Sequence, residues 1–466
     1  MRSALPVRLC LAAALLGAGV LSGCRPGTAL HSRYNNFRAY YNTYYNATRS
    51  LDSGEEALQR QAVTLDRNTL VSVFPATTAG STSGPFQEAI DKSAELLRNR
   101  PTSKWADDAL LVIGKAYFYQ RNFAGAEQKF RETLAASEAA GDRRLGDEAR
   151  FWLGRTFAAA DRFEEGVGVL EEGLAAEGGD RRWTARMQLA LGDLYARAGR
   201  WEEATEALLV GAPAEGDADI AARAYVLLGQ VEEHLGQWDE AAAAYAEALS
   251  RRPAYELGYA ARVNRALVIG LSADRPAEGL QIIRDMRGDD KNYERRGELA
   301  LVEARLRGAM GEPDRAYRLF RSVLYDEELN GRVVAGEAHF RLGEFYRDQR
   351  NDFVRASAHF DSAATAVRPP APEVRPAAGA LLRVTEQARV YATLASAARQ
   401  IAETDSLLAL GALSEEDFQA RIASIEAERL RVYREEQRRL QAARTAAAFS
   451  GSSAGTYDDG AEGAGQ

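Results

Sequence analysis

Small residues recur in pairs along this chain at a nearly constant spacing. In four pairs a glycine inside an apolar helical pattern is followed twelve positions later by Ala or Gly in a second such pattern, and in a fifth pair the spacing is thirteen. Small side chains let two antiparallel helices approach closely, and one hairpin alone cannot bury its apolar face. The spacing therefore predicts stacked helical hairpins that form a curved solenoid. The pairs are Gly114/Ala126, Gly154/Gly166, Gly192/Ala204, Gly229/Ala241 and Gly343/Ala356.

The clearest unit covers residues 227–249. Gly229 and Ala241 lack bulk where the two helices meet, and Trp238 and Tyr245 are expected to fill the gaps between them. This unit resembles the tetratricopeptide repeat. The sequence thus predicts an all-α tetratricopeptide-repeat solenoid of about seven hairpins, two of them divergent, with extra C-terminal helices.

The segments on either side of the repeats differ from them in composition. Residues 72–85 are rich in turn-forming residues and carry no charge. The predicted organisation is a lipoprotein signal at 1–23, a lipidated aromatic-rich helical arm at 24–71, a linker at 72–85, the solenoid at 86–370, a helical extension at 371–448 and a disordered tail at 449–466.

The first residues have the pattern of a lipoprotein export signal. Arg2 and Arg8 precede an uncharged apolar run that ends in Leu-Ser-Gly-Cys24. The run is shorter than the roughly 20 residues that span a bilayer, so we expect cleavage and lipidation at Cys24. By the usual sorting rule for bacterial lipoproteins, the absence of Asp directly after the cysteine favours the periplasmic face of the outer membrane. Arg25 stands at that position. The alternatives are an uncleaved anchor or a secretory signal with an incidental cysteine.

Charge and cysteine content exclude several classes of protein. Without Arg2 and Arg8 the chain has 57 Lys and Arg against 67 Asp and Glu, which argues against general nucleic-acid binding. The second cysteine, Cys10, would leave with the signal, so the mature chain has no partner for a disulfide and no thiolate metal site.

The predicted arm is basic and aromatic. Residues 25–51 contain no Asp or Glu. At helical spacing Tyr34, Phe37, Tyr41 and Tyr44 share one face. This face either packs on the first repeat and caps the solenoid, or lies near a membrane interface, or binds a partner protein.

Two segments carry a narrower resemblance. The aromatic and asparagine-rich stretch 31–47, placed just after a lipidated cysteine, and the stretch 103–119 that opens the first full repeat look like the gliding-motility and type IX secretion tetratricopeptide lipoproteins (SprE/PorW-like). Residues 405–416 are similar to the segment that follows the repeats in that family. The resemblance implies an outer-membrane lipoprotein that helps to link the periplasmic ring of the secretion machinery to its translocon.

Binding is expected to use surfaces. The first helix of each hairpin should line a concave groove of mixed charge. Its residues are either candidate partner contacts or simply exposed side chains: Lys115, Phe118, Tyr119, Arg155, Asp193, Arg197, Gln230 and Glu233.

No pattern of residues predicts chemistry. The four histidines lie in different helices or in the arm, and only His339 and His359 are close in sequence. We predict no catalytic residue, metal, cofactor or small-molecule substrate. The predicted function is a non-catalytic scaffold in an outer-membrane secretion complex, and the alternatives are a barrel-assembly lipoprotein or a cell-wall enzyme or regulator.

The last helix carries an apolar stripe and is either solvated or part of a coiled coil. The stripe consists of Phe418, Ile422, Ile425 and Val432.

Overall fold

The computed structural model describes residues 29–60, 65–67, 69–75, 83–326, 329, 331–366 and 379–451, and every regular element in this part of the chain is a helix. None of these described helices is both long and apolar enough to cross a membrane. The predicted signal, Cys24 and residues 452–466 of the predicted tail lie outside the described residues. Residues 449–451 belong to the last helix.

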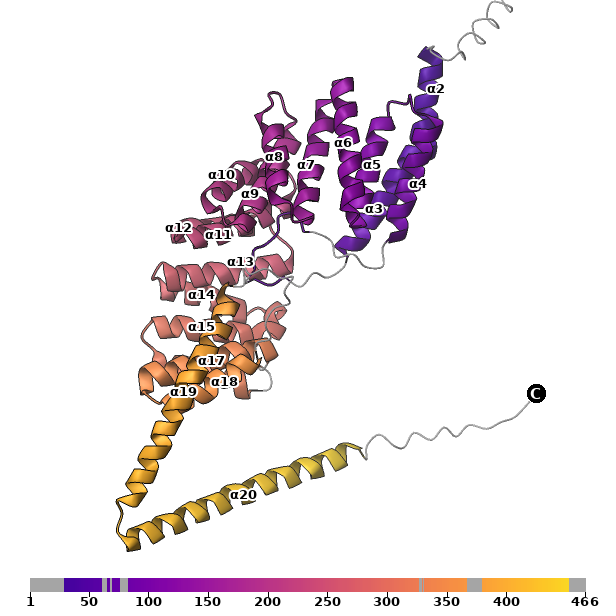
Figure 1. Cartoon of the computed structure of the whole chain (residues 1–466). Coiled ribbons are helices and arrows are strands. Elements are labelled where there is room, and N and C mark those ends of the chain that lie inside the picture. Colours follow the sequence, from indigo (N-terminus) through magenta and orange to yellow (C-terminus); the bar gives the residue numbers. More distant parts are fainter. Residues whose placement is uncertain are drawn as a thin grey trace, which may run out of the picture.

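Seven helical hairpins stack side by side into a curved array (Figure 1). The predicted all-α solenoid of stacked hairpins is therefore confirmed. The regular hairpins pair α5 (Ala106–Tyr119) with α6 (Phe123–Ala140), α7 (Arg143–Ala159) with α8 (Phe163–Ala175), α9 (Arg181–Ala198) with α10 (Trp201–Ala214), and α11 (Ala218–Leu235) with α12 (Trp238–Ser250). The last three pair α13 (Tyr255–Leu267) with α14 (Pro276–Arg287), α15 (Arg296–Ala309) with α16 (Pro313–Tyr325), and α17 (Arg332–Arg350) with α18 (Phe353–Ala366).

One contact recurs in the regular hairpins. A Cβ atom built on Gly114 would lie 2.5 Å from Phe130, and one built on Gly229 would lie 2.8 Å from Tyr245. Each glycine thus leaves room for a large side chain sixteen positions later on the facing helix. Tyr245 is completely buried there, as predicted. Trp238 is 36% exposed, because it is the first residue of α12 and lies over the turn at Gly236 instead of between the helices.

An eighth hairpin precedes these seven. It pairs α3 (Tyr45–Gln59) with α4 (Ser83–Asn99). A Cβ on Gly54 would lie 2.6 Å from Phe86, which repeats the contact of the later hairpins. Because 32 positions separate these two residues instead of sixteen, the sequence pattern hid the pair. The second half of the predicted arm is therefore a repeat helix, which differs from the predicted boundary at residue 86.

The insertion between α3 and α4 returns to the body of the molecule. Its described residues, 65–67 and 69–75, are called the strap below. Val71 and Val73 are 2% and 0% exposed and join the core formed by the first repeats. The structure differs here from the predicted linker, because the apolar side chains of residues 71–74 are covered by the solenoid.

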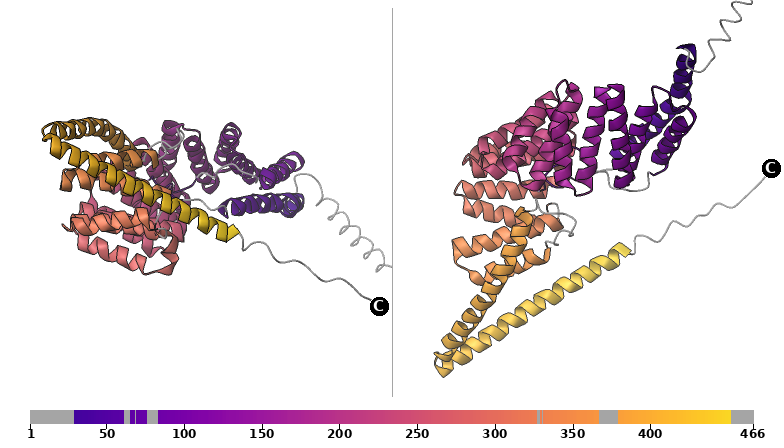
Figure 2. Two further views of the ribbon diagram at one scale, coloured as in Figure 1. Left: turned by 90° about the horizontal axis from the view of Figure 1, so that it is seen from below. Right: turned by 45° about the horizontal axis from the view of Figure 1, so that its top comes forward.

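Two long helices follow the repeats. α19 (Gly379–Gly411) packs on α18 and continues past the end of the solenoid. α20 (Glu415–Gly451) leaves the far end of α19 at a sharp angle and diverges from it (Figures 1 and 2). Ser414 caps α20, since its Oγ accepts a hydrogen bond from the backbone N–H of Asp417 at 3.2 Å. Leu407 and Leu408 are 69% and 67% exposed at the far end of α19.

Candidate interaction surfaces

The strap is bound to the first helices of the hairpins through its backbone. Gln230 of α11 accepts a hydrogen bond from the N–H of Val71 and donates one to the carbonyl of Thr69, both at 2.8 Å. Asn264 of α13 donates to the carbonyl of Arg67 at 3.4 Å. One glutamine and one asparagine therefore satisfy backbone groups that would otherwise be buried without partners.

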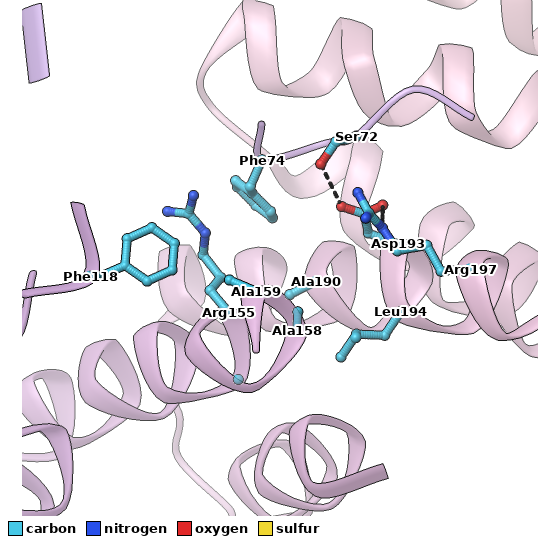
Figure 3. Close-up of a pocket in the computed structure, with 11 residues that line it drawn as sticks. Ser72, Phe74, Phe118, Arg155, Ala158, Ala159, Ala190, Asp193, Leu194 and Arg197 are labelled. Atoms are coloured by element: carbon cyan, nitrogen blue, oxygen red, sulfur yellow. Dashed lines mark hydrogen bonds and ion pairs between the residues drawn. The ribbon is translucent and has the colours of Figure 1, made fainter. Parts of the chain in front are cut away.

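Polar side chains of the strap are paired as well. The hydroxyl of Ser72 donates to Oδ2 of Asp193 at 2.9 Å, while Oδ1 of the same carboxylate accepts from Arg197 at 3.1 Å (Figure 3). Arg67 forms an ion pair with Glu298 of α15 at 2.5 Å. These contacts run from α9 to α15, so a single segment ties several consecutive hairpins together.

An aromatic cluster holds the end of the strap. The guanidinium of Arg155 lies 5.3 Å from the Phe74 ring (Figure 3). The Phe74 ring also meets Phe151 edge-on at 4.9 Å, and the Arg155 guanidinium lies 4.5 Å from the ring of Trp152. Burial lowers the pKa of Arg155, and the neighbouring Tyr119 opposes that shift. The hollow that remains beside Phe74 has a volume of about 60 Å³. Pockets for small molecules are usually about 300 Å³ or larger, so the strap fills most of this part of the groove.

The other predicted groove residues also have partners inside the chain. Lys115 pairs with Glu148, and Phe118 is 4% exposed. Tyr119 stacks on Phe86 with ring centroids 5.0 Å apart. Glu233 accepts a hydrogen bond from the Tyr245 hydroxyl at 2.5 Å, and burial raises the pKa of Glu233. The structure therefore brings the eight predicted residues to one face, where intramolecular contacts engage them.

Beyond the strap a more open hollow remains. It lies between α15, α16 and α17 and has a volume of about 320 Å³. Arg305, Phe320 and Phe345 are among its lining residues. Burial lowers the pKa of Arg305 to about 10, and Glu337 opposes the shift.

The arm has one docked face and one exposed face. It consists of α2 (Ala29–Ala39), a π-helical turn η1 (Tyr40–Tyr44) and α3. Tyr44 stacks on Trp105 at 4.9 Å, and Tyr40 meets the same ring at 4.9 Å. Tyr34, Phe37 and Tyr41 are 58%, 61% and 57% exposed. The predicted stripe is thus divided: the π-turn places Tyr44 on the docked side with Tyr40, while the other three rings face outward.

The docked face joins the two segments that carry the family resemblance. Oδ1 of Asn36 accepts hydrogen bonds from the N–H of Lys104 at 3.0 Å and from the Ser103 hydroxyl at 3.3 Å. Arg100 donates to Asn35 at 2.6 Å. Residues 31–47 and 103–119 therefore form one packed unit. This agrees with the alternative that the arm packs on the first repeat, although the contact uses Tyr40 and Tyr44 instead of the whole predicted face.

The histidines make one close pair. Nδ1 of His339 lies 2.9 Å from Nδ1 of His359, and Tyr346 stacks on His359 at 5.4 Å. Burial and the neighbouring His339 lower the pKa of His359 to about 4. The contact is satisfied when both rings are neutral and the Nδ1–H of one ring donates to the unprotonated Nδ1 of the other. No group of three or more His, Cys, Asp or Glu that could hold a metal ion occurs among the described residues.

The tetratricopeptide-repeat family matches residues 111–181 and 189–256, which span the regular hairpins from α5 to the start of α13. The fold is a tetratricopeptide-repeat solenoid. Solenoids of this kind generally mediate protein–protein interactions through their extended surfaces. No curated protein matches the sequence.

Several solved structures are similar to this tetratricopeptide solenoid. A tetratricopeptide repeat protein from Parabacteroides merdae is 15% identical, with 61% of this chain and 98% of that one covered and a TM-score of 0.41. The apo form of RapI is 13% identical, with 60% and 80% covered and a TM-score of 0.42. The type IV pilus biogenesis factor PilW is 15% identical, with 61% and 96% covered and a TM-score of 0.34.

Proposed function

We propose that this protein is a non-catalytic lipoprotein scaffold, anchored through Cys24 to the periplasmic face of the outer membrane, that holds protein partners of a type IX secretion or gliding complex. The observation that carries the proposal is the lipoprotein signal pattern that ends in Leu-Ser-Gly-Cys24 and precedes a repeat solenoid. The aromatic arm of that solenoid has the asparagine-rich motif of the family. The packing of the arm motif on the opening of the first repeat supports it, because the two matching segments form one structural unit.

The surfaces available to partners differ from the groove that the sequence suggests. The strap occupies the groove from α9 to α15, so a partner that binds there has to compete with Ser72 for Asp193 and with the strap backbone for Gln230. The outward face of the arm, the far part of α19 and α20 stay uncovered. We therefore assign partner binding to these exposed surfaces and a stabilising role to the groove.

Crosslinking in cells tests the assignment to a complex. A photoreactive amino acid at an exposed position of α20, such as Tyr433, should recover components of a secretion or gliding machine. The matched control places the same group at Tyr245, which is fully buried and should crosslink only within the chain. Recovery of barrel-assembly subunits without any secretion component would instead favour a barrel-assembly lipoprotein.

Two further measurements separate the anchor from the scaffold. Mass analysis of the protein from cells should find an acylated Cys24 as the first residue, and Cys24→Ser should move the protein from the membrane fraction to the soluble periplasm. Purified mature protein should not cleave peptidoglycan. Turnover that one point mutation abolishes would establish the cell-wall enzyme.

A further inference from the structure

The exposed side of the arm is held outward by its docked side. Asn36, Tyr40 and Tyr44 are fixed on the turn between α4 and α5, so the helix cannot roll to bury the opposite face. That face presents rings that are 46–61% exposed. We call it the aromatic stripe; it consists of Tyr34, Phe37, Tyr41 and Tyr45.

The stripe combines apolar rings with positive charge. The Phe37 and Tyr41 rings lie 4.7 Å apart, and Arg38 donates a hydrogen bond to the Tyr34 hydroxyl at 3.3 Å. Arg33 is exposed on the same helix, and no acidic residue occurs between residues 25 and 51. Tyrosine rings with a wet hydroxyl end favour the boundary between lipid headgroups and water, and arginine is attracted to lipid phosphates.

The proposed lipid anchor would also bring the stripe near a membrane. α2 lies at the N-terminal end of the solenoid, far from α18 and α20 (Figures 1 and 2). The helix begins at Ala29, five residues after Cys24. Five residues span at most about 18 Å when fully extended. A lipid chain on Cys24 would therefore keep the stripe close to the headgroup layer, where even weak contacts become effectively intramolecular.

We propose that the aromatic stripe rests on the headgroup layer of an anionic phospholipid membrane and fixes how the solenoid stands on it. This inference rests on the proposed function for the lipid anchor. A lipid anchor on Cys24 is a single attachment point, which holds the protein at the membrane but by itself leaves its orientation free. The stripe supplies a second attachment on a rigid helix, which turns the anchored chain into an oriented one.

A vesicle assay on the unlipidated protein tests the stripe without the anchor. The mature chain with Cys24→Ser is mixed with vesicles of phosphatidylethanolamine and phosphatidylglycerol and sedimented. A triple variant should partition onto the vesicles at least about tenfold less than the parent, because three interfacial rings are lost. It carries Tyr34→Ser, Phe37→Ser and Tyr41→Ser. The matched control removes Ile401, Leu407 and Leu408, which are 63–69% exposed on α19, and should leave partitioning unchanged.

A dye measurement localises the contact. Since Cys10 and Cys24 are the only cysteines, Phe37→Cys in the mature Cys24→Ser chain carries a single thiol for an environment-sensitive dye. Vesicles should shift its emission to the blue, whereas the same dye at Leu408→Cys should not respond. Equal partitioning of the stripe variant and the parent, or an unchanged dye at position 37, would overturn the proposal.

Two outcomes distinguish membrane binding by the stripe from protein docking and from a failure of the proposed lipid anchor. If the stripe variant loses a crosslinked protein partner in cells while vesicle partitioning is unchanged, the stripe is a protein-docking face and the membrane contact is refuted. If Cys24 proves unacylated in cells while the stripe still binds vesicles, the anchor in the proposed function fails and the membrane contact of the stripe stands.

Discussion

The groove and the arm both carry closely spaced aromatic side chains, but the chain covers those of the groove and leaves one face of the arm exposed. Phe118 and Trp152 are 4% and 6% exposed beneath the strap and its neighbours, whereas Phe37 and Tyr41 are 61% and 57% exposed. An aromatic-rich concave face can therefore be filled by the chain itself and is then no free binding site. Here an insertion in the first hairpin supplies the segment that covers the groove, while the outward aromatic rings of the arm stay exposed.

The largest effect on stability should come from a charge placed on the buried side of the strap. Val73 is completely buried, so Val73→Asp puts a carboxylate into an apolar environment and should cost roughly 3 kcal/mol or more of stability. Tyr41→Asp is the matched change on the arm and should alter stability by about 0.5 kcal/mol or less, as at most exposed sites. Urea unfolding of the two variants measures both. Similar midpoints would remove the distinction between the covered groove and the open arm.

A smaller loss should follow from filling the space at Gly54. A methyl group there would lie 2.6 Å from Phe86, so Gly54→Ala should cost about 1 to 3 kcal/mol through overpacking. Gly168→Ala is the control, because nothing lies within 4 Å of that site in α8 and alanine favours the helix by up to about 1 kcal/mol. Hydrogen exchange should become faster in α3 and α4 of the first variant. Unchanged exchange there would show that the eighth hairpin lacks this contact.

The backbone clamp on the strap should have a moderate effect. Gln230→Ala leaves the N–H of Val71 and the carbonyl of Thr69 without their partner, which should cost about 1 to 2 kcal/mol. Exchange of the Val71 amide should accelerate. Gln281→Ala removes an exposed side-chain hydrogen bond to Asp285 and should change neither. Continued protection of Val71 in the Gln230 variant would mean that other contacts suffice to hold the strap.

The smallest effect concerns the last hairpin, α17 and α18. The pKa of His359 is lowered to about 4 by burial and by His339, and burial also lowers the pKa of His339. Between the unfolded pKa near 6.5 and the folded value, the unfolded state binds protons that the folded state does not. Stability of α17 and α18 should therefore fall as the pH falls through this window.

Hydrogen exchange at several pH values, corrected for intrinsic rates, measures that loss. Acidification should loosen α17 and α18 before the strap-bound α9 and α11, and His359→Gln should weaken the pH dependence. Uniform loosening of all hairpins would contradict the assignment to the histidine pair.

The repeats themselves were predictable from sequence. Gly114 and Gly229 each lie sixteen positions before the large side chain that they face. Close helix packing requires a small residue at each crossing, and the two packed helices are neighbours in sequence. The Ser414 cap and the long helix after it follow from equally local rules. Local sequence patterns therefore predict the seven hairpins and the two helices that follow them.

Tertiary structure alone decided which surfaces stay open. Gly54 meets Phe86 across 32 positions, and Gln230 binds the backbone of Val71 across 159, so no local pattern announces either contact. The π-turn likewise sends Tyr44 inward and leaves Tyr41 outside, although helical spacing puts them on one face. A sequence determines where helices form because helix rules act over a few residues. Whether a groove is filled depends on distant segments of the chain meeting in space.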